Sequence, residues 1–466
     1  MNIDPLRTQL FVDDAIVEST RRVGRSLHQP IRYGRVMKAD RPWENGAAMT
    51  YGSVVHEGDR FRMWYQTAGR VLPGERTVVC YAESANGLDW EKPSLGLHSF
   101  KGSCDNNIVV VPPNGLQLNS PNVLFDVDDS GRPYKLTCFM KRSRSNPKEG
   151  GIWVAFSNDG IEWVWNEGPV ISRTGDCNTI MSDPLGEYPY VAYVRSRRDI
   201  EIARRRVVSR SVSSDFINWS EPELTFGPDR DDGYDVEAYR MPVFVYGQTY
   251  LGFPAMLHTE IDRIDVQLAS SRDGHTWERQ VDRTPFLPRG ESPAWDHAWV
   301  GLSTNPPIQV HGSLYLFHEG REAAHGEPIP ALRRSGVGLA VLRQDGFVSL
   351  DAGPVEGEVV TRSFTWSGGD LVVNVDTNAG IGPVNRGMGY VNIEILDHEG
   401  DVISGYETHL CRGLRDEFKR GNPNQVVRWD SDVSLAALQG RRIAIRFTMR
   451  QARLYAFRSS LGVPGP

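Results

Sequence analysis

The chain has 466 residues and a formal net charge of −7, which argues against the basic surface of a nucleic-acid-binding protein. Hydrophobic residues make up 39% and aromatic residues 10%, which excludes a wholly disordered chain. The 46 glycines and 29 prolines are typical of turn-rich all-β proteins.

No run of about 18 apolar residues occurs, so the sequence predicts no transmembrane helix. The first residues contain no basic segment followed by an apolar one, so no secretory signal is predicted. The five cysteines form no CxxC motif and no zinc-binding spacing, which favours reduced thiols in a cytoplasmic protein. A chain whose signal peptide had been removed would look the same. No cofactor, metal site or membrane partner is predicted, and the oligomeric state is left open.

The first predicted element is a strand at Thr8–Asp13. Five strand–turn–strand patterns follow it. They start near Tyr51, Asn122, Thr179, Met241 and Gly301.

A seven-residue pattern follows the first four of these hairpins: Ser, any residue, Asn or Asp, usually Gly, two residues, and Trp. Ser and Asx side chains accept hydrogen bonds from nearby backbone N–H groups, and Gly adopts positive φ, so each copy predicts a tight turn. The copies run from Ser84 to Trp90, Ser157 to Trp163, Ser213 to Trp219 and Ser271 to Trp277, with a degenerate fifth at Gln344–Phe347.

Five units of four strands predict a five-bladed β-propeller, whose last blade the N-terminal strand at Thr8–Asp13 could close. After Pro354 the pattern changes to longer strands that alternate apolar and polar residues, as in Arg442–Met449. Such alternation indicates half-buried antiparallel sheets. The expected fold is therefore all-β, with a five-bladed β-propeller in residues 1–354 and a C-terminal β-sandwich in residues 355–466.

Acidic residues stand just before the first strand of four units, where a propeller directs side chains at its central channel. These acids are Glu44, Asp176, Glu237 and Asp296. Single loop acids are often solvated or bonded to local backbone, so the recurrence in four units carries the interpretation. Carboxylates among aromatic residues suit a sugar, because carboxylates bind hydroxyls and perform acid–base chemistry.

Glu237 is the expected general acid, because it has the longer reach and two apolar sequence neighbours, which favour a protonated carboxyl. Asp176 is expected to be the nucleophile or base, with Asp296 and Glu44 as alternatives. The residues expected to bind substrate are Trp43, Asn45, Asn119, Asn178, Asp235, Tyr239, Arg240, Trp295, His297 and Trp299.

Two arginine clusters, Arg195–Arg198 and Arg204–Arg206, suggest contact with an anion, although solvated charge at a strand edge is the interpretation favoured by the sequence. Cys177 has no histidine partner placed by a motif, so it is expected to be a wall residue rather than a nucleophile.

The chain resembles bacterial proteins related to glycoside hydrolase family 32. The resemblance lies in Leu10–Asp14, Pro42–Glu44, Met241–Phe244, Asp345–Leu350 and Arg453–Arg458. It implies the five-bladed propeller with three funnel acids that families 32, 43, 62 and 68 share, and activity on fructo- or arabinofuranosides. The Trp-Met-Asn-Asp-Pro-Asn, Arg-Asp-Pro and Glu-Cys motifs of family 32 are absent.

The leading hypothesis is a glycosidase acting on a furanoside or a related sugar. The alternatives are a non-catalytic carbohydrate-binding propeller, or a transglycosylase or phosphorylase of the same fold. Asp176 and Glu237 are expected to face each other across the funnel. A separation of about 5–5.5 Å would imply retention of configuration and about 6.5–9.5 Å inversion, and the resemblance favours retention.

Overall fold

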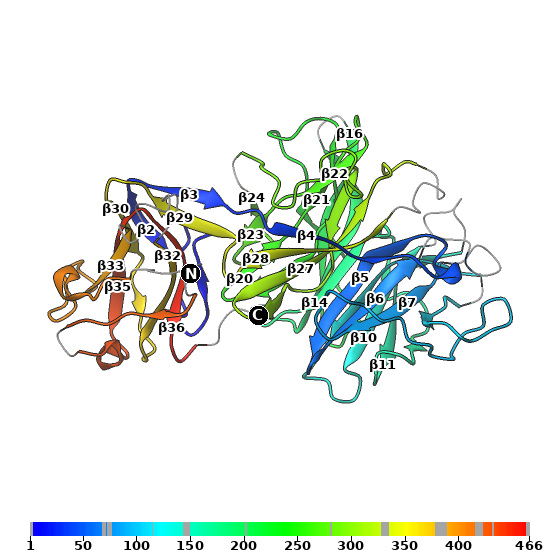
Figure 1. Ribbon diagram of the computed structural model, residues 1–466, viewed down its shortest axis with the longest axis horizontal. Coiled ribbons are helices and arrows are strands. Elements are labelled where there is room, and N and C mark those ends of the chain that lie inside the picture. Colours follow the sequence, from blue (N-terminus) through cyan, green and yellow to red (C-terminus); the bar gives the residue numbers. More distant parts are fainter. Residues whose placement is uncertain are drawn as a thin grey trace.

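The computed structural model describes residues 3–67, 71, 77–113, 115–142, 150–200, 203–279, 282–327, 335–377, 389–414, 423–430 and 433–462. The chain forms two β-bodies side by side, a five-bladed propeller and a β-sandwich, as the sequence predicts (Figure 1). The described residues include three short 3₁₀ helices, η1 (Pro42–Glu44), η5 (Thr408–Leu410) and η6 (Leu435–Leu438). None of the helices in this part of the chain is long and apolar enough to cross a membrane.

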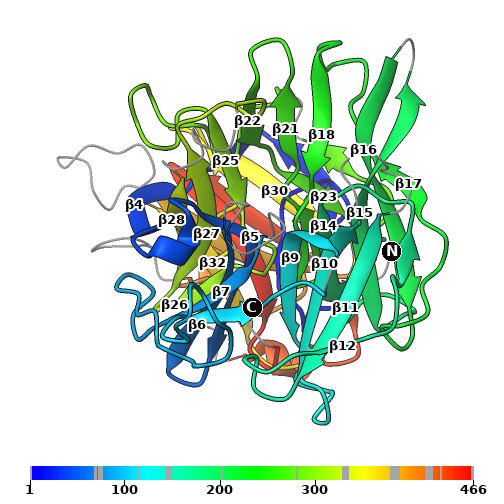
Figure 2. The ribbon, with the colours of Figure 1, turned by 90° about the vertical axis from the view of Figure 1, so that its right-hand side faces the viewer.

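Blades 1 to 3 are antiparallel sheets whose strands follow one another in sequence. Their first strands, β5, β9 and β14, lie against one another around the centre of the propeller (Figure 2). Blade 1 consists of β5 (Ala48–Glu57), β6 (Arg60–Thr67), β7 (Val79–Ser84) and β8 (Ile108–Val110). Blade 2 consists of β9 (Gln117–Phe125), β10 (Tyr134–Lys141), β11 (Gly151–Ser157), β12 (Val164–Trp165) and β13 (Ile171–Ser172). Blade 3 consists of β14 (Asn178–Ser182), β15 (Tyr190–Ile200), β16 (Ala203–Ser213) and β17 (Glu223–Phe226).

Blade 4 has interrupted strands. Pro242 separates β18 from β19, and Pro254 separates β20 from β21, because proline lacks the N–H that a ladder needs. The segments are β18 (Val236–Arg240), β19 (Val243–Tyr246), β20 (Thr249–Gly252), β21 (Ala255–His258), β22 (Arg263–Val266), β23 (Ala269–Ser271) and β24 (Glu278–Arg279).

Blade 5 is closed by β4 (Ile31–Lys38), which comes from the N-terminal part of the chain and pairs antiparallel with β28. The other strands of this blade are β25 (Trp299–Leu302), β26 (Ile308–Val310), β27 (Ser313–Arg321) and β28 (Gly336–Arg343). The prediction that Thr8–Asp13 closes the ring is wrong, since β1 (Gln9–Leu10) pairs with β36 in the sandwich. Closure by β4 covers what would otherwise be the free edge of blade 5.

The sandwich packs two sheets around one apolar core, to which Phe11, Val17, Ile393 and Phe447 contribute. One sheet contains β1, β3 (Val23–Leu27), β29 (Val348–Ala352), β36 (Ala452–Ser459), β32 (Leu371–Asp376) and β34 (Gln425–Val426). The other contains β2 (Val17–Arg21), β30 (Gly357–Thr361), β35 (Arg442–Arg450), β31 (Phe364–Thr365) and β33 (Tyr390–Leu396).

The sheet pairing differs from the expected division at residue 354. Strands β1, β2, β3 and β29 belong to the sandwich, although the prediction assigned residues 1–354 to the propeller. The physical reason is that these pairings join segments more than 300 residues apart, and the pattern of a short strand does not encode its partner. Figure 1 shows the chain leaving the sandwich at β3 and reaching the propeller at β4.

The seven-residue repeat joins the third and fourth strands, since β7, β11, β16 and β23 all end at its serine. In the second copy the hydroxyl of Ser157 accepts N–H groups from Asp159 and Gly160 at 3.2 and 2.8 Å. The carboxylate of Asp159 accepts the next two N–H groups at 2.8 and 2.9 Å. Phe216 replaces glycine in the third copy and still has a φ of 68°, so the side-chain hydrogen bonds impose the turn.

Candidate functional site

Glu44 is a structural residue rather than part of an open site. Its carboxylate is fully buried and accepts the N–H groups of Asp40 and Arg41, both at 2.7 Å. It also accepts the hydroxyl of Tyr65 at 2.6 Å and forms an ion pair with Lys92 at 2.6 Å. Both carboxylate oxygens are therefore occupied by the loop and by blade 1.

The two neighbours of Glu44 also hold this loop. The indole N–H of Trp43 donates to Asn107 at 2.6 Å, and its ring packs against Phe100. Asn45 ends η1 in the left-handed conformation, with a φ of 50°. Glu44, Trp43 and Asn45, which the sequence predicts to form part of the site, therefore stabilise a closed turn.

Asp296 lies over the outer part of blade 5, where it pairs with Arg32 on β4 at 2.5 Å. Burial raises the pKa of this carboxyl, although Arg32 opposes the shift. Trp295 stacks on His318 and lies against Gly320, where a Cβ would come within 2.4 Å of the indole. Glycine in β27 therefore admits the Trp295 ring.

His297 and Asn178 have local partners. The Nδ1 of His297 lies 2.8 Å from the carbonyl of Ala294. The amide of Asn178 accepts from Thr137 and donates to the carbonyl of Ser120, which ties blade 3 to blade 2. Asn178 is buried and its bonds are structural.

Asp176 and Glu237, at the starts of neighbouring blades, are the two predicted acids that contact the same hairpin. Asp176 precedes β14 and forms an ion pair with the guanidinium of Arg195 on β15. Asn119 on β9 donates to its second oxygen at 3.4 Å. Asp176 keeps 29% of its side chain exposed, so it remains accessible from the cavity described below.

Glu237 lies on β18 with 12% of its side chain exposed. It forms an ion pair with the guanidinium of Arg206, accepts the Arg206 backbone N–H at 3.3 Å, and pairs with Arg197 at 3.6 Å. The expectation that apolar side chains surround this acid is wrong. Val236 and Ala238 point to the opposite face of the strand, into the core shared by blades 3 and 4.

The β15–β16 hairpin connects the two acids. Its register pairs Arg197 with Arg206 and Asp199 with Arg204, so Arg195, Arg197, Arg204 and Arg206 share one face. Burial and then the neighbouring guanidiniums lower the pKa of Arg197 and Arg206. Burial also disfavours the charged form of Arg195, but the Asp176 carboxylate acts together with Cys177, Tyr239 and Tyr51 to raise the pKa of Arg195 above its ordinary value.

Aromatic rings support these arginines. Arg195 lies over the ring of Tyr239 at 5.1 Å, and Tyr239 meets Trp299 edge to face at 4.9 Å. The hydroxyls of Tyr239 and Tyr51 lie 3.1 Å apart. Tyr239 and Trp299 are 6% and 1% exposed, so they underlie the site instead of offering the open stacking surface that the sequence suggests.

A buried ion cluster that the sequence analysis missed adjoins these rings. Glu319 on β27 has no exposed surface and pairs with Arg240 at 3.5 Å and with Arg321 at 3.3 Å. Arg321 lies 3.8 Å from the centre of the Trp299 ring. Arg240 is therefore a partner of Glu319, which explains its burial. The signal in the sequence is the charged pair Glu319 and Arg321 in a strand that a propeller must bury.

His325 stacks on Trp299 with ring centres 5.5 Å apart. Burial lowers the pKa of His325 to about 4, and the charge of Arg206 adds to the shift, so the ring is neutral at pH 7. Cys177 is buried under Arg195, and burial raises the pKa of its thiol to about 11. The thiol environment therefore agrees with a wall residue rather than a nucleophile.

A cavity of about 1000 Å³ opens beside the β15–β16 hairpin, and its wall includes Asp176, Gly175 and Arg195 together with Phe139 from blade 2. Glu237 is not among the described residues of the cavity wall, but it contacts one of them, Arg197. Asp235 is half-buried directly before β18, and its backbone carbonyl accepts a hydrogen bond from the Thr259 hydroxyl. The structure thus joins Asn119 to Asp176 and binds both Asp176 and Glu237 to the β15–β16 hairpin, whereas Glu44 and Asp296 have partners elsewhere.

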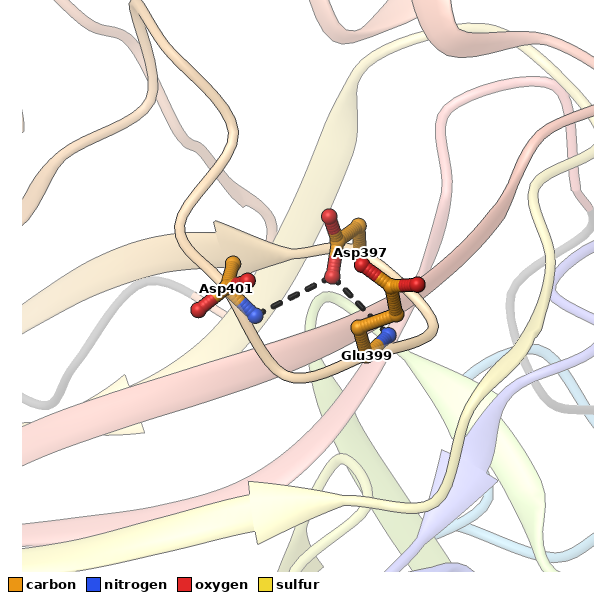
Figure 3. Close-up of side chains that lie close together, drawn as sticks. All are labelled: Asp397, Glu399 and Asp401. Carbon is orange, nitrogen blue, oxygen red and sulfur yellow. Dashed lines mark hydrogen bonds between the residues drawn. The ribbon is translucent and has the colours of Figure 1, made fainter.

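Three acidic side chains of the sandwich also lie close together, Asp397, Glu399 and Asp401 (Figure 3). Asp397 accepts the N–H groups of Glu399 and Asp401 at 2.9 and 3.0 Å. These backbone hydrogen bonds lower the pKa of Asp397, chiefly through Asp401. The arrangement is that of a tight turn between paired strand ends.

No protein-family model matches the chain, and no curated protein matches it. Solved structures to which it is similar include one described as a glycoside hydrolase, with 16% identity and a TM-score of 0.48 over 67% of this chain and 92% of that one. A family 32 β-fructofuranosidase from Bombyx mori has 14% identity and a TM-score of 0.42 over 93% and 94% of the two chains. An α-L-arabinofuranosidase from Podospora anserina in complex with cellotriose has 12% identity and a TM-score of 0.45 over 68% and 97%. Glycoside hydrolases, family 32 among them, are thus proteins to which this chain is similar.

Proposed function

We propose that the protein is a carbohydrate-active enzyme of the glycosidase type that works at the cavity beside the β15–β16 hairpin. The observation that supports this most is that Asp176 and Glu237 start neighbouring blades and each bind arginines of the same hairpin. Asp176 is also open to the cavity. Asp176 lines the cavity and Glu237 contacts the lining residue Arg197, so the site offers the two carboxylates that glycoside hydrolysis requires.

In this proposal Glu237 protonates the leaving oxygen and Asp176 acts as nucleophile or base. Glu237 must then exchange its contacts with Arg197 and Arg206 for a contact with the substrate, because a general acid needs its proton. A furanoside is the substrate that the family 32 resemblance favours. The stereochemical outcome, for which the same resemblance favours retention, stays a prediction.

A non-catalytic carbohydrate-binding propeller is the second candidate. It is favoured by the same ion pairs, since guanidinium groups already hold both carboxylates. Such a protein would bind sugar with the arginines and the amide of Asn119 and would have no need for a free acid.

The test is a screen of aryl furanosides, aryl pyranosides and oligosaccharides with the purified protein. Glu237→Gln should lower the rate by about 10²–10⁴, the usual contribution of a positioned proton donor. The matched control is Asp296→Asn, which removes another buried acid and should leave turnover intact. Saturable binding without turnover by the wild-type protein would contradict the enzyme and support the binding module.

A further inference from the structure

The cavity beside the β15–β16 hairpin is strongly cationic in a chain of net charge −7. Of the eleven described residues that line it, six carry positive charge and one, Asp176, carries negative charge. The six are Lys141, Arg173, Arg195, Arg197, Arg198 and Arg204. The hairpin that carries four of them projects at the upper edge of the molecule (Figure 1).

The positive charge is only partly compensated inside the protein. Arg195 pairs with Asp176, and Arg197 pairs with Glu237. Within the described ranges, Arg173, Arg198 and Arg204 make no ion pair with a carboxylate, and the same holds for Lys141. Asp199 stands opposite Arg204 in the register but does not form an ion pair with it.

The register also places like charges together. Arg197 and Arg206 are directly opposite each other, and like charges at such positions destabilise a strand pair. Glu237 relieves part of this repulsion, yet the pKa of both arginines is lowered, first by burial and then by nearby guanidiniums. Guanidinium groups placed this close together are what a site for anions requires. Solvated charge at a strand edge does not require them to be so close.

We propose that this cavity binds the acidic groups of an anionic glycan, namely its carboxylates or sulfates. The inference rests on the proposed function, since it names the substrate class of the same site. Guanidinium groups bind carboxylate and sulfate oxygens in bidentate geometry and remain charged at every physiological pH. The cavity volume of about 1000 Å³ is at the upper end for small-molecule sites, about 300–1,000 Å³, and exceeds what one free oxyanion needs.

The arrangement also links recognition to chemistry. Arg197 lies in the cavity wall and contacts Glu237, so an acidic group that binds Arg197 withdraws it from the carboxylate. An acidic substrate would therefore remove one of the two guanidinium contacts of Glu237 on binding, while the contact with Arg206 remains. A neutral sugar of the same size would leave the ion pair in place.

The test measures binding and does not depend on turnover. Trigalacturonate, its fully methyl-esterified form, a sulfated heparin disaccharide and inorganic phosphate are titrated calorimetrically into the wild-type protein. At least one of the two acidic glycans should bind ten times more tightly than the methyl ester. Its affinity should fall at least tenfold in Arg198→Gln/Arg204→Gln and also at high salt. Arg412→Gln, which removes one positive charge from an exposed site of the sandwich, should bind like the wild type.

Binding of the methyl ester as tightly as the acid would overturn the inference, as would the absence of binding by both acidic glycans. Tight binding of phosphate alone would also overturn it and would indicate a free anion as co-substrate. Binding of an acidic glycan without any turnover would retain the inference and reject the proposed enzyme, so the two failures are distinguishable.

Discussion

The ion pair of Glu44 and Lys92 allows a direct separation of stability from function. In Glu44→Gln the charge disappears while the shape stays, and Lys92 is left with 4% of its side chain exposed. Removing one partner of a buried pair costs about 3–5 kcal/mol. Asp40 lies 2.8 Å from the same ammonium and is half-exposed, so it offsets part of the loss. We expect a loss of about 3 kcal/mol in the free energy of unfolding.

Urea unfolding of four proteins checks this value: the wild type, Glu44→Gln, Lys92→Met and the double variant. The double variant should lose less than the two single losses added together, since it leaves no buried charge without a partner. Turnover by the folded Glu44→Gln protein should equal that of the wild type, because both oxygens of Glu44 contact the loop and blade 1. If Glu44→Gln keeps its stability and loses turnover, the assignment of Glu44 to the scaffold is refuted.

Three further predictions concern stability. Burial lowers the pKa of His318 to about 4, so below about pH 6.5 the unfolded chain binds a proton at this residue that the native state does not bind. The free energy of unfolding should therefore fall by about 3 kcal/mol as the pH drops from 6.5 to 4. In His318→Asn this pH-dependent loss should be absent from denaturation curves. Gly52→Ala should destabilise the protein by about 1–3 kcal/mol or more in thermal unfolding, because the new Cβ would lie 1.8 Å from the carbonyl oxygen of Trp64. The control is Gly24→Ala, whose Cβ has nothing within 4 Å and which should leave the melting temperature nearly unchanged. Asp159→Ala removes the acceptor of two backbone N–H groups and should cost about 1–3 kcal/mol; an unchanged melting temperature would contradict the role of this carboxylate in the turn.

The turns of the propeller could be predicted because their hydrogen bonds are local. The serine and Asx side chains bond N–H groups two and three residues away, so the pattern from Ser157 to Trp163 contains both partners of each bond. The rings of Trp90 and Trp277 then pack against Phe317 and Tyr193 of adjacent blades. Repetition of such a self-contained unit is enough to predict a five-bladed propeller.

The sites of the acids could be predicted only in part. Glu44, Asp176 and Asp296 stand before the first strand of a blade and Glu237 lies at the start of one, yet the outcome for each depends on side chains far away in the sequence. Lys92 and Tyr65 close around Glu44, and Arg32 reaches Asp296 from a strand 264 residues away. An acid at a strand start carries no local sign of which partner it will meet.

Local chemistry in the sequence by itself determined the repeat, the all-β class and the candidate acids of this protein. Tertiary structure alone decided that β4 closes the ring, that β1 to β3 complete the sandwich, and that Asp176 and Glu237 meet the arginines of one hairpin. The physical reason is the range of the interactions. A turn is stabilised by bonds within seven residues, whereas sheet partners and ion pairs are selected by burial and charge among segments that the chain brings together only on folding.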